Sequence, residues 1–337
     1  MGVYIIGEAG VNHNGSLKLA KELCQVAKDS GVDAVKFQTW KTENIVTRSV
    51  DMATYQENNV ADLNESQFQM LKKLELKYAD FIELKNYCDL IGIRFLSTPD
   101  DEESLDFLVS LNLDFLKIGS GEVTNIPYLR KIGAKKQSVV LSTGMSTLGD
   151  VERAYLTLKD VGAKDITLLH CTTNYPCPMN EVNLRAIQTL KDAFKCKVGY
   201  SDHTMGIEIP IAAVAMGAEI IEKHFTLDRN MEGPDHKASL NPEELTAMVK
   251  AIRHIEKAMG DGIKQPNKSE KEISQVVLKR IVAKTLIREG DILSEANMTV
   301  KRSSEGIPSQ YWDLFIGLKA VQDYEVDDAI KLTTYEF

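Results

Sequence analysis

Eight short apolar runs, each closing on polar or small residues, alternate with segments of helical period along the first 225 residues. The runs cover residues 3–8, 33–39, 93–98, 115–120, 138–143, 166–171, 197–203 and 219–225. Between the first two, Leu17, Ala20, Leu23, Cys24 and Ala27 recur at the spacing of one helix face. Strand and helix alternating eight times, mostly without hairpin signals, predict an α/β fold in which a parallel sheet closes into a TIM (β/α)8 barrel.

The sequence changes character after a helix that we expect from Pro242 to about Met259. The stretch GDGIKQPNKSEKEIS, rich in Gly, Lys, Ser and Glu, indicates a linker over residues 263–276. Beyond it, short β-like runs are broken by REGD and SSEGIP. We therefore predict a barrel over residues 1–262, the linker, and a small, mostly β domain over residues 277–337.

Composition argues against several classes of protein. The formal charge of −9, without a run rich in Lys or Arg, argues against a nucleic-acid surface. There is no basic leader at the N-terminus, and no apolar run reaches the roughly 18 residues of a membrane span. We expect a cytoplasmic protein with neither nucleic acid nor membrane as partner. The five cysteines are scattered, without zinc-site spacing, and are expected to be reduced.

Nearly every predicted strand ends in a polar group. In a TIM barrel the catalytic groups collect at the carboxyl ends of the strands, so this pattern predicts an active site there, with ordinary loop polarity as the alternative. In chain order, the strand ends carry Glu8, Lys36 and Gln38, Thr98, Lys117 and Ser120, Ser142, His170, Ser201 and His203, and Glu222 and His224.

Two histidines, His203 and His224, leave successive predicted strands. Neighbouring parallel strands lie about 4.8 Å apart, so both rings can reach one point above the barrel. The pair is a candidate site for a divalent metal such as Mn²⁺, Fe²⁺, Co²⁺ or Zn²⁺, with open positions for a substrate oxygen. The alternative is two hydrogen-bonded histidines, because the sequence offers no obvious third ligand.

Two lysines, Lys36 and Lys117, are predicted to point into the barrel, where unpaired charges are costly. With the hydroxyls of Thr98 and Ser142 they could hold a phosphate or carboxylate. The alternative is internal ion pairs with glutamates, namely Glu8, Glu122 and Glu222. A lysine on a barrel strand could instead form a Schiff base with a carbonyl substrate, as in a class I aldolase.

The last predicted strand, IIEKHF, alternates its faces. Glu222 and His224 share one face, while Lys223 lies on the other. We expect Lys223 to point outward, where its stem can reach solvent. Asp235, in the following GPDHKAS loop, is a candidate to face the substrate.

Nine motifs in chain order resemble the sialic acid synthase family, which includes N-acetylneuraminate synthase and legionaminic acid synthase. They are GEAGVNHNGS, VKFQTW, FLSTP, KIGSGE, LSTGM, HCTTNYPCP, GYSDHT, EKHFTLD and GPDHKAS. From about Val282 onward, the chain resembles the antifreeze-like (SAF) domain of these enzymes. The resemblance covers nearly all of the chain.

The resemblance implies condensation of phosphoenolpyruvate with an N-acetylated mannosamine-type sugar, giving phosphate and a nine-carbon 2-keto sugar acid. It implies Mn²⁺ as the metal, with Mg²⁺ or Co²⁺ as alternatives, bound by His203 and His224 with Glu222 beside it. The positions that it assigns to phosphoenolpyruvate or to the wider substrate site are Lys36, Thr98, Lys117, Ser120, Ser142 and Ser201. Those that it assigns to the sugar or to catalysis are Glu8, Gln38, Tyr175 and Asp235, with Glu8 acting on the water that attacks C2.

The resemblance also implies a domain-swapped homodimer, in which Arg302 of the small domain reaches the sugar in the partner's barrel. The chain departs from the family at Asp100, where phenylalanine is usual, at Asn174, where glutamate is common, and in the loop 303–306. N-acetylmannosamine is the expected acceptor, giving N-acetylneuraminate. The alternative acceptor is 2,4-diacetamido-2,4,6-trideoxymannose, giving N,N'-diacetyllegionaminate. A reversible TIM-barrel aldolase and an ice- or glycan-binding module remain as rival functions.

Overall fold

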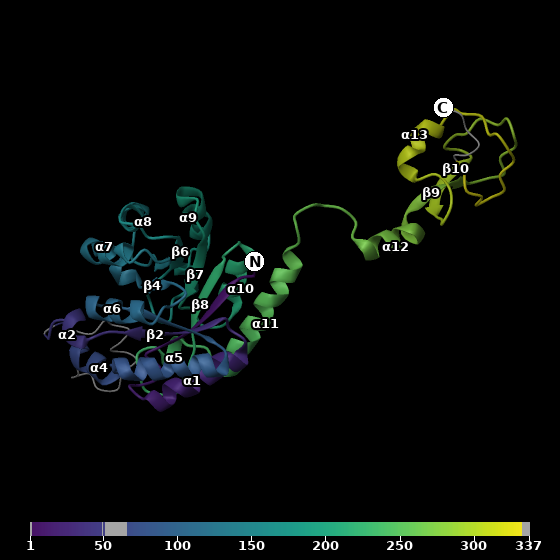
Figure 1. Cartoon of the computed structure of the whole chain (residues 1–337). Helices are drawn as coiled ribbons and strands as arrows, with labels where there is room; N and C mark the ends of the chain where they lie inside the picture. The colour runs from purple at the N-terminus through teal and green to yellow at the C-terminus, as the bar shows by residue number, and fades with distance from the viewer. Residues whose placement is uncertain (1, 49, 51–65, 332–337) are drawn as a thin grey trace. The chain divides into compact units, whose positions relative to one another are not determined.

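The computed structural model describes residues 2–48, 50 and 66–331 of the chain (Figure 1). The chain divides into two compact units, Met1–Gly260 and Asp261–Phe337. Residues 261–276 therefore group with the second unit. Within the described residues, no helix is long and apolar enough to cross a membrane. All five cysteines are described and none forms a disulfide, as the sequence predicted.

The first unit contains the predicted eight-stranded parallel sheet. Its hydrogen-bonded order is β3-β2-β1-β8-β7-β6-β5-β4, and the two edge strands, β3 and β4, lie in contact without a ladder between them. The sheet is thus a nearly closed TIM-like barrel, which confirms the predicted fold. The strands are β1 (Tyr4–Gly10), β2 (Ala34–Thr39), β3 (Arg94–Pro99), β4 (Leu116–Ile118), β5 (Val139–Ser142), β6 (Ile166–Cys171), β7 (Val198–Asp202) and β8 (Ile220–His224).

Helices follow the strands and cover the outer face of the sheet (Figure 1). They are α1 (Leu17–Ser30), α2 (Thr42–Ile45), α4 (Gln67–Leu74), α5 (Tyr78–Ile91), α6 (Glu102–Ser110), α7 (Ile126–Ala134), α8 (Leu148–Asp160), α9 (Ala186–Phe194), α10 (Glu208–Ala215) and α11 (Pro242–Met259). Short 3-10 turns, η1 (Ser120–Glu122), η2 (Met179–Glu181) and η3 (His236–Ala238), occur in the loops. In α1, the apolar residues whose spacing predicted one helix face, Ala20, Leu23, Cys24 and Ala27, are all buried.

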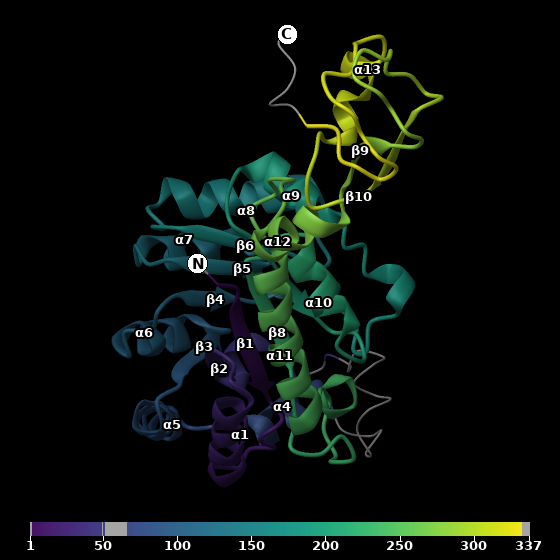
Figure 2. The same ribbon diagram turned by 90° about the vertical axis from the view of Figure 1, so that its right-hand side faces the viewer.

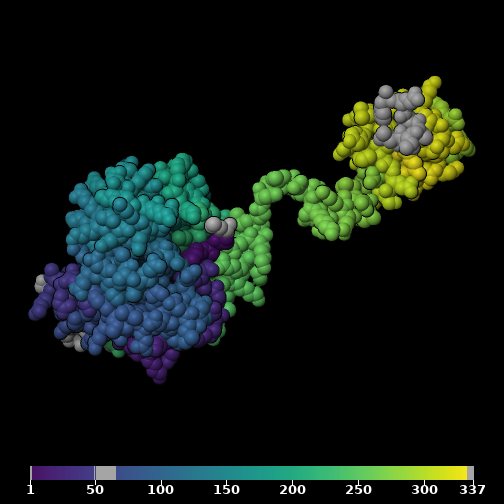
Figure 3. All heavy atoms as spheres, in the orientation of Figure 1, coloured from purple at the N-terminus to yellow at the C-terminus, as the bar shows by residue number. Residues whose placement is uncertain are grey.

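The last helix of this unit, α11, joins the two ends of the barrel sequence. It packs against both α1 and α10 and lies between them in Figure 2. Arg253 of α11 donates to the backbone oxygen of Val3 at 2.7 Å and pairs with Asp33 at 2.7 Å. In the space-filling view, the purple N-terminal segment accordingly lies against the green atoms of α11 (Figure 3). These contacts cover the start of β1, which brings Glu8 into the barrel.

The second unit has a core of its own. Strands β9 (Lys279–Ala283) and β10 (Met298–Arg302) pair antiparallel, followed by η4 (Ser309–Tyr311) and α13 (Trp312–Phe315). Ile281, Ile287, Leu293, Phe315 and Ile330 are fully buried in it. The segment predicted as a linker differs from the expectation. It contains helix α12 (Lys268–Val277), which begins with a capping box between Asn267 and Glu270. The sequence analysis missed this helix start because the segment is rich in polar residues, which are also typical of a linker.

We predict that Gly199→Ala destabilises the barrel. A Cβ at this position in β7 would collide with the backbone oxygen of Ile220 and lie 2.6 Å from Leu169 Cδ2. Overpacking of this kind costs about 1–3 kcal/mol, and the backbone cannot yield as a side chain can. The midpoint of urea unfolding should fall accordingly. Gly149→Ala is the matched control, since its nearest atom, Thr147 Oγ1, is 3.9 Å away; equal midpoints for the two variants would contradict the prediction.

Candidate active site

A cavity of about 190 Å³ lies at the carboxyl ends of the barrel strands. Its lining includes all the predicted site residues except His170, Asp235 and Arg302. They are Glu8, Lys36, Gln38, Thr98, Lys117, Ser120, Ser142, Tyr175, Ser201, His203, Glu222 and His224. A larger cavity of about 1110 Å³ opens near the amino ends of the strands and contains none of them. We therefore place the site in the smaller cavity, because it holds the buried charges and imidazoles.

A strand irregularity brings Glu8 into this cavity. The pairing of β1 with β2 shifts between Glu8 and Gly10, which adopts a φ of +49°. A Cβ at Gly10 would lie 3.2 Å from Glu8 Oε1, so glycine suits both the backbone conformation and the space. Gln38 Nε2 donates to the same Glu8 oxygen at 3.3 Å.

Lys36 links two carboxylates across the cavity floor. Its Nζ lies 2.7 Å from Glu8 Oε2 and 3.7 Å from Glu222 Oε2. It also donates to Thr98 Oγ1 at 2.9 Å. Both carboxylates and the lysine are almost completely buried. The internal ion pairs considered as an alternative are thus present for Glu8 and Glu222.

Lys117 reaches Glu222 from the other side. Its Nζ lies 3.2 Å from Glu222 Oε1, which also accepts from Ser201 Oγ at 3.0 Å. The backbone oxygen of Ile118 accepts a longer bond from Lys117, at 3.4 Å. Together with Lys36 and Glu8, these groups form an alternating row of two negative and two positive side chains.

The two glutamates of this row have opposite pKa shifts. Burial raises the pKa of Glu8 to about 7, with Lys36 opposing the rise and Glu222 adding to it. Burial acts on Glu222 in the same direction, but Lys117 and Lys36 outweigh it and lower its pKa to about 2. Glu8 is therefore suited to exchange a proton near neutral pH, while Glu222 stays ionised.

The two predicted histidines lie side by side. The ring centroids of His203 and His224 are 5.4 Å apart, and Tyr175 stacks on His203 with a centroid distance of 4.0 Å. His203 Nδ1 donates to the backbone oxygen of Thr172 at 2.6 Å, which leaves Nε2 as the nitrogen for a ligand. His224 Nδ1 lies 3.6 Å from Asp235 Oδ2 and has no hydrogen-bond partner among the described residues.

This histidine pair fits a metal that keeps open positions. Burial lowers the pKa of His224 well below its usual value, and His203 lowers it further, so the ring is neutral at pH 7. Burial also lowers the pKa of His203, but Cys171 outweighs it and the net shift is upward. In the described part of the chain, no three His, Cys, Asp or Glu residues form a metal-binding group.

Two hydroxyls in the cavity wall lack hydrogen bonds. Ser142 Oγ and Thr173 Oγ1 are buried and have no partner in the part of the chain that the structure describes. Buried polar groups are nearly always bonded, so a ligand in the cavity is the natural partner. Sequence reasoning missed Thr173, because it lies in an irregular loop after β6 where no periodicity shows which way a side chain points.

The cavity also contains one of the departures from the family pattern. Asp100 lines it, whereas Asn174 does not. Burial raises the pKa of Asp100 to about 7, and Glu122 adds to the rise while Lys36 opposes it. Asp100 therefore adds a third carboxylate, after Glu8 and Glu222, to the wall of the cavity.

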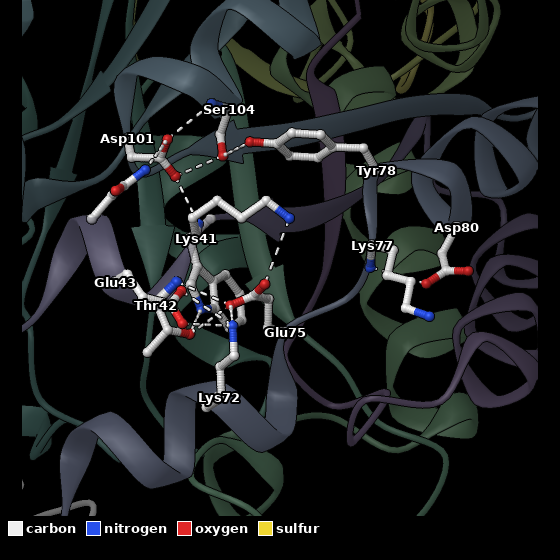
Figure 4. A network of polar contacts seen from close by, with 12 residues as sticks. Lys41, Thr42, Glu43, Lys72, Glu75, Lys77, Tyr78, Asp80, Asp101 and Ser104 are labelled. Carbon is white, nitrogen blue, oxygen red and sulfur yellow. Dashed lines mark hydrogen bonds and ion pairs between the residues drawn. The ribbon is translucent and has the colours of Figure 1, made fainter.

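A polar network outside the cavity holds the ends of β2 and β3 together (Figure 4). Asp101 accepts from the backbone N–H of Lys41 at 2.8 Å. Glu75 accepts from the backbone N–H and the hydroxyl of Thr42, at 3.0 and 2.8 Å, and pairs with Lys41 at 3.6 Å. Lys41 follows β2 and Asp101 follows β3, so the network fixes two strand ends that carry cavity residues.

The cavity wall does not include His170, Asp235, Arg302 or Lys223. His170 Nε2 donates instead to the backbone oxygen of Val182 at 2.7 Å. Asp235 is buried, its Oδ2 lies 3.6 Å from His224 Nδ1, and its role toward the substrate stays a prediction. Arg302 belongs to the second unit, where it is exposed at the end of β10, and its role stays a prediction. The expectation for Lys223 was wrong, because the side chain is fully buried and pairs with Asp202. The outer face of β8 is covered, so the stem cannot reach solvent.

We predict that Glu8 makes folding stability depend on pH. Between its ordinary pKa of 4.5 and about 7, the folded protein binds more protons at Glu8 than the unfolded chain does. Its contribution to stability is therefore fully present below pH 4.5 and is lost as the pH rises through 7. Relative to wild type, Glu8→Gln should gain on the order of 2 kcal/mol between pH 5 and pH 8, measured by urea unfolding. Glu22→Gln, at an exposed carboxylate of α1, is the control; a constant difference for Glu8→Gln would contradict the assignment.

Known proteins resemble the chain over most of its length. The NeuB family model matches residues 23–264, and the SAF domain model matches residues 280–333. The chain is 54% identical to the N,N'-diacetyllegionaminic acid synthase of Campylobacter jejuni subsp. jejuni serotype O:2, covering 97% of this chain and 98% of that protein. It is 47% identical to the enzyme of the same name from Legionella pneumophila subsp. pneumophila, covering 92% and 88% of the two chains.

A solved structure shares both the fold and the sequence. The N-acetylneuraminic acid (sialic acid) synthetase of Leptospira borgpetersenii serovar Hardjo-bovis, in complex with citrate, superposes with a TM-score of 0.71 at 36% identity. The alignment covers 81% of this chain and 90% of that one. With its barrel, its cavity residues and its small C-terminal domain, the chain belongs to the NeuB family and carries a SAF domain.

Proposed function

We propose that this protein condenses phosphoenolpyruvate with an acetamido mannose-type sugar and releases phosphate. In this reaction, C3 of phosphoenolpyruvate forms a bond to the aldehyde carbon of the open-chain sugar. Water adds to C2, and phosphate leaves from C2 by cleavage of the C–O bond, which gives a 2-keto sugar acid. The observation that carries the proposal is one cavity whose wall combines two buried lysines, two hydroxyls without hydrogen bonds among the described residues, and two imidazoles.

The lysines retain capacity for an anion. An ammonium group has three donors. Lys36 donates to Thr98 and forms an ion pair with Glu8, and Lys117 donates to the backbone oxygen of Ile118 and forms an ion pair with Glu222. Each lysine therefore keeps one donor for a ligand, and the phosphate and carboxylate of phosphoenolpyruvate offer two acceptor ends.

The hydroxyls supply the remaining donors. Ser142 Oγ has no other partner among the described residues, so it can donate to the bound anion without losing an existing bond. Thr98 and Ser201 are already bonded to Lys36 and Glu222, and they hold these charges in place. Ser120 Oγ accepts from the backbone N–H of Gly144 at 2.9 Å and donates to Cys171 Sγ at 3.7 Å, so a ligand would have to replace this weak bond to sulfur.

Glu8 is our candidate for the proton transfer at C2. With a pKa raised to about 7, it can take a proton from the attacking water near neutral pH. Gln38 donates to one carboxylate oxygen and Lys36 pairs with the other, so the group is held in one orientation. Glu222 stays ionised and acts as the counter-ion of both lysines.

His203 and His224 would hold a divalent metal, for which Mn²⁺ is our proposal. Such an ion supplies Lewis acidity toward a carbonyl oxygen. The neutral ring of His224 and the oriented ring of His203 suit this role. Asp235, 3.6 Å from His224 Nδ1, is placed to orient that ring. The homodimer implied by the resemblance also stays a prediction.

The aldolase alternative is less well supported. A Schiff base requires a neutral amine. Burial lowers the pKa of Lys36, but Glu222 and Glu8 outweigh it and the net shift is upward. Lys117 is paired with Glu222. The raised pKa of Lys36 and the ion pair of Lys117 with Glu222 suit anion binding better than carbinolamine formation.

We favour 2,4-diacetamido-2,4,6-trideoxymannose as the acceptor, in place of the N-acetylmannosamine that the sequence alone favoured. Two relatives named as N,N'-diacetyllegionaminic acid synthases are 54% and 47% identical to this chain. The neuraminic acid synthetase structure is 36% identical. The two sugars differ mainly at carbons 4 and 6, so a few cavity side chains are enough to select between them.

The reaction is tested by phosphate release from phosphoenolpyruvate. Metal-stripped protein should release phosphate only after Mn²⁺ and an acceptor sugar are added. Release should be faster with the diacetamido sugar than with N-acetylmannosamine. A reversal of this preference would return the acceptor to N-acetylmannosamine. No release with either sugar from folded protein would contradict the proposal, and trapping of a lysine adduct by borohydride with pyruvate would establish the aldolase.

A second prediction separates ligand binding from folding. Ser142→Ala should raise the KM for phosphoenolpyruvate by about tenfold or more, because a hydrogen bond to a charged group contributes about 1.5–3 kcal/mol. Its stability should not change, since Ser142 Oγ has no partner in the described residues. Ser97→Ala is the matched control. It loses the bond from Ser97 Oγ to Thr39 Oγ1, 2.7 Å long, and should lose about 1 kcal/mol of stability at unchanged KM.

A further inference from the structure

A buried ion pair lies directly behind the two histidines. Lys223 and Asp202 are both 0% exposed, and their charged atoms are 2.5 Å apart. The pair is not part of the cavity wall. A fully buried ion pair contributes little net stability compared with apolar packing, so its presence calls for another explanation.

The strand register links this pair to the histidines. Asp202 of β7 is the direct partner of Lys223 in β8. Side chains alternate along a strand, so the next residue after each, His203 and His224, points to the opposite side, into the cavity. Each candidate metal ligand therefore directly follows one member of the ion pair in the sequence.

Asp202 also closes the turn that contains His203. Its Oδ1 accepts from the backbone N–H of Thr204 at 3.1 Å and from the Thr204 hydroxyl at 2.9 Å. Tyr200 donates its hydroxyl to the same oxygen at 3.0 Å. Lys223 Nζ donates to the backbone oxygen of Thr204 as well as to Asp202. The backbone on both sides of His203 is thus tied to β8.

We propose that the Asp202–Lys223 pair is a positioning device that sets the spacing of His203 and His224 and thereby the affinity of the metal site. The proposal rests on the metal site of the proposed function. Asp202 and Lys223 act through the backbone and bind neither metal nor substrate. Removing one member leaves the other as an uncompensated buried charge, which must move or draw in water, and the turn around His203 moves with it.

The test is Mn²⁺ binding, followed by the electron paramagnetic resonance signal of the free and bound ion. Lys223→Met keeps the length of the stem and removes the charge; we expect its Mn²⁺ affinity to fall at least tenfold and the spectrum of the bound ion to change. The double variant Asp202→Asn/Lys223→Met removes both charges and should recover part of that loss. His224→Ala, which removes a ligand, marks the full loss, and exposed His254→Ala should bind as wild type.

A variant in the barrel core tests whether a loss of stability alone would weaken Mn²⁺ binding. Leu158→Ala truncates a fully buried residue of α8, so it lowers the unfolding temperature without touching β7 or β8. We expect it to bind Mn²⁺ with unchanged affinity at a temperature where it is folded. A Lys223→Met variant that binds Mn²⁺ as tightly as wild type, with an unchanged spectrum, would overturn the proposal.

If Lys223→Met does not fold, two variants that keep both charges of the ion pair test the positioning role instead. Tyr200→Phe and Thr204→Val each remove hydrogen bonds to Asp202 and keep both charges. We expect each to weaken Mn²⁺ binding by about threefold, and unchanged affinity in both would overturn the proposal. Failure of the metal site itself would look different, because wild-type protein would then not bind Mn²⁺ at all.

Discussion

Burial of four charges in the mouth of one barrel is the constraint on which the site depends. Glu8, Lys36, Glu222 and Lys117 come from four different strands, and each is paired with a neighbour of opposite sign. Ionised groups stay buried only when they are paired and hydrogen-bonded. The row therefore stays intact only while the strands keep their register, and a displaced strand would leave a charge alone in the interior.

The same row explains the division of roles between the two glutamates. Glu222 contacts two ammonium groups, and their charges lower its pKa to about 2. Glu8 contacts only one, so burial prevails and raises its pKa to about 7. Two identical side chains thereby have different pKa values, which supports the separate roles that we propose for them.

Much of the site could be predicted from the sequence, because strand ends are local features. The runs over residues 3–8, 138–143 and 219–225 carry Glu8, Ser142 and His224 at or near their ends, and parallel strands stop at one edge of a barrel. Lys223 could not be judged in this way. Alternation shows the face of the sheet on which it lies, but not that this face is covered or that Asp202, 21 residues earlier, is its partner. Such pairings depend on strand register, which a single sequence does not reveal.

The seam between β3 and β4 gives the barrel one compliant side. Every other pair of neighbouring strands is joined by backbone hydrogen bonds, and these two edges only touch. The spacing across the seam can change without breaking a ladder, whereas spreading β7 from β8 would cost several bonds. The seam adjoins Asp100 and the glycines of the GSGE turn, Gly119 and Gly121, which line the cavity. This seam is therefore the one strand junction of the barrel at which separation breaks no backbone ladder, while Asp100 beside it stays bonded to β2 through its N–H and the Thr39 oxygen, 3.0 Å apart.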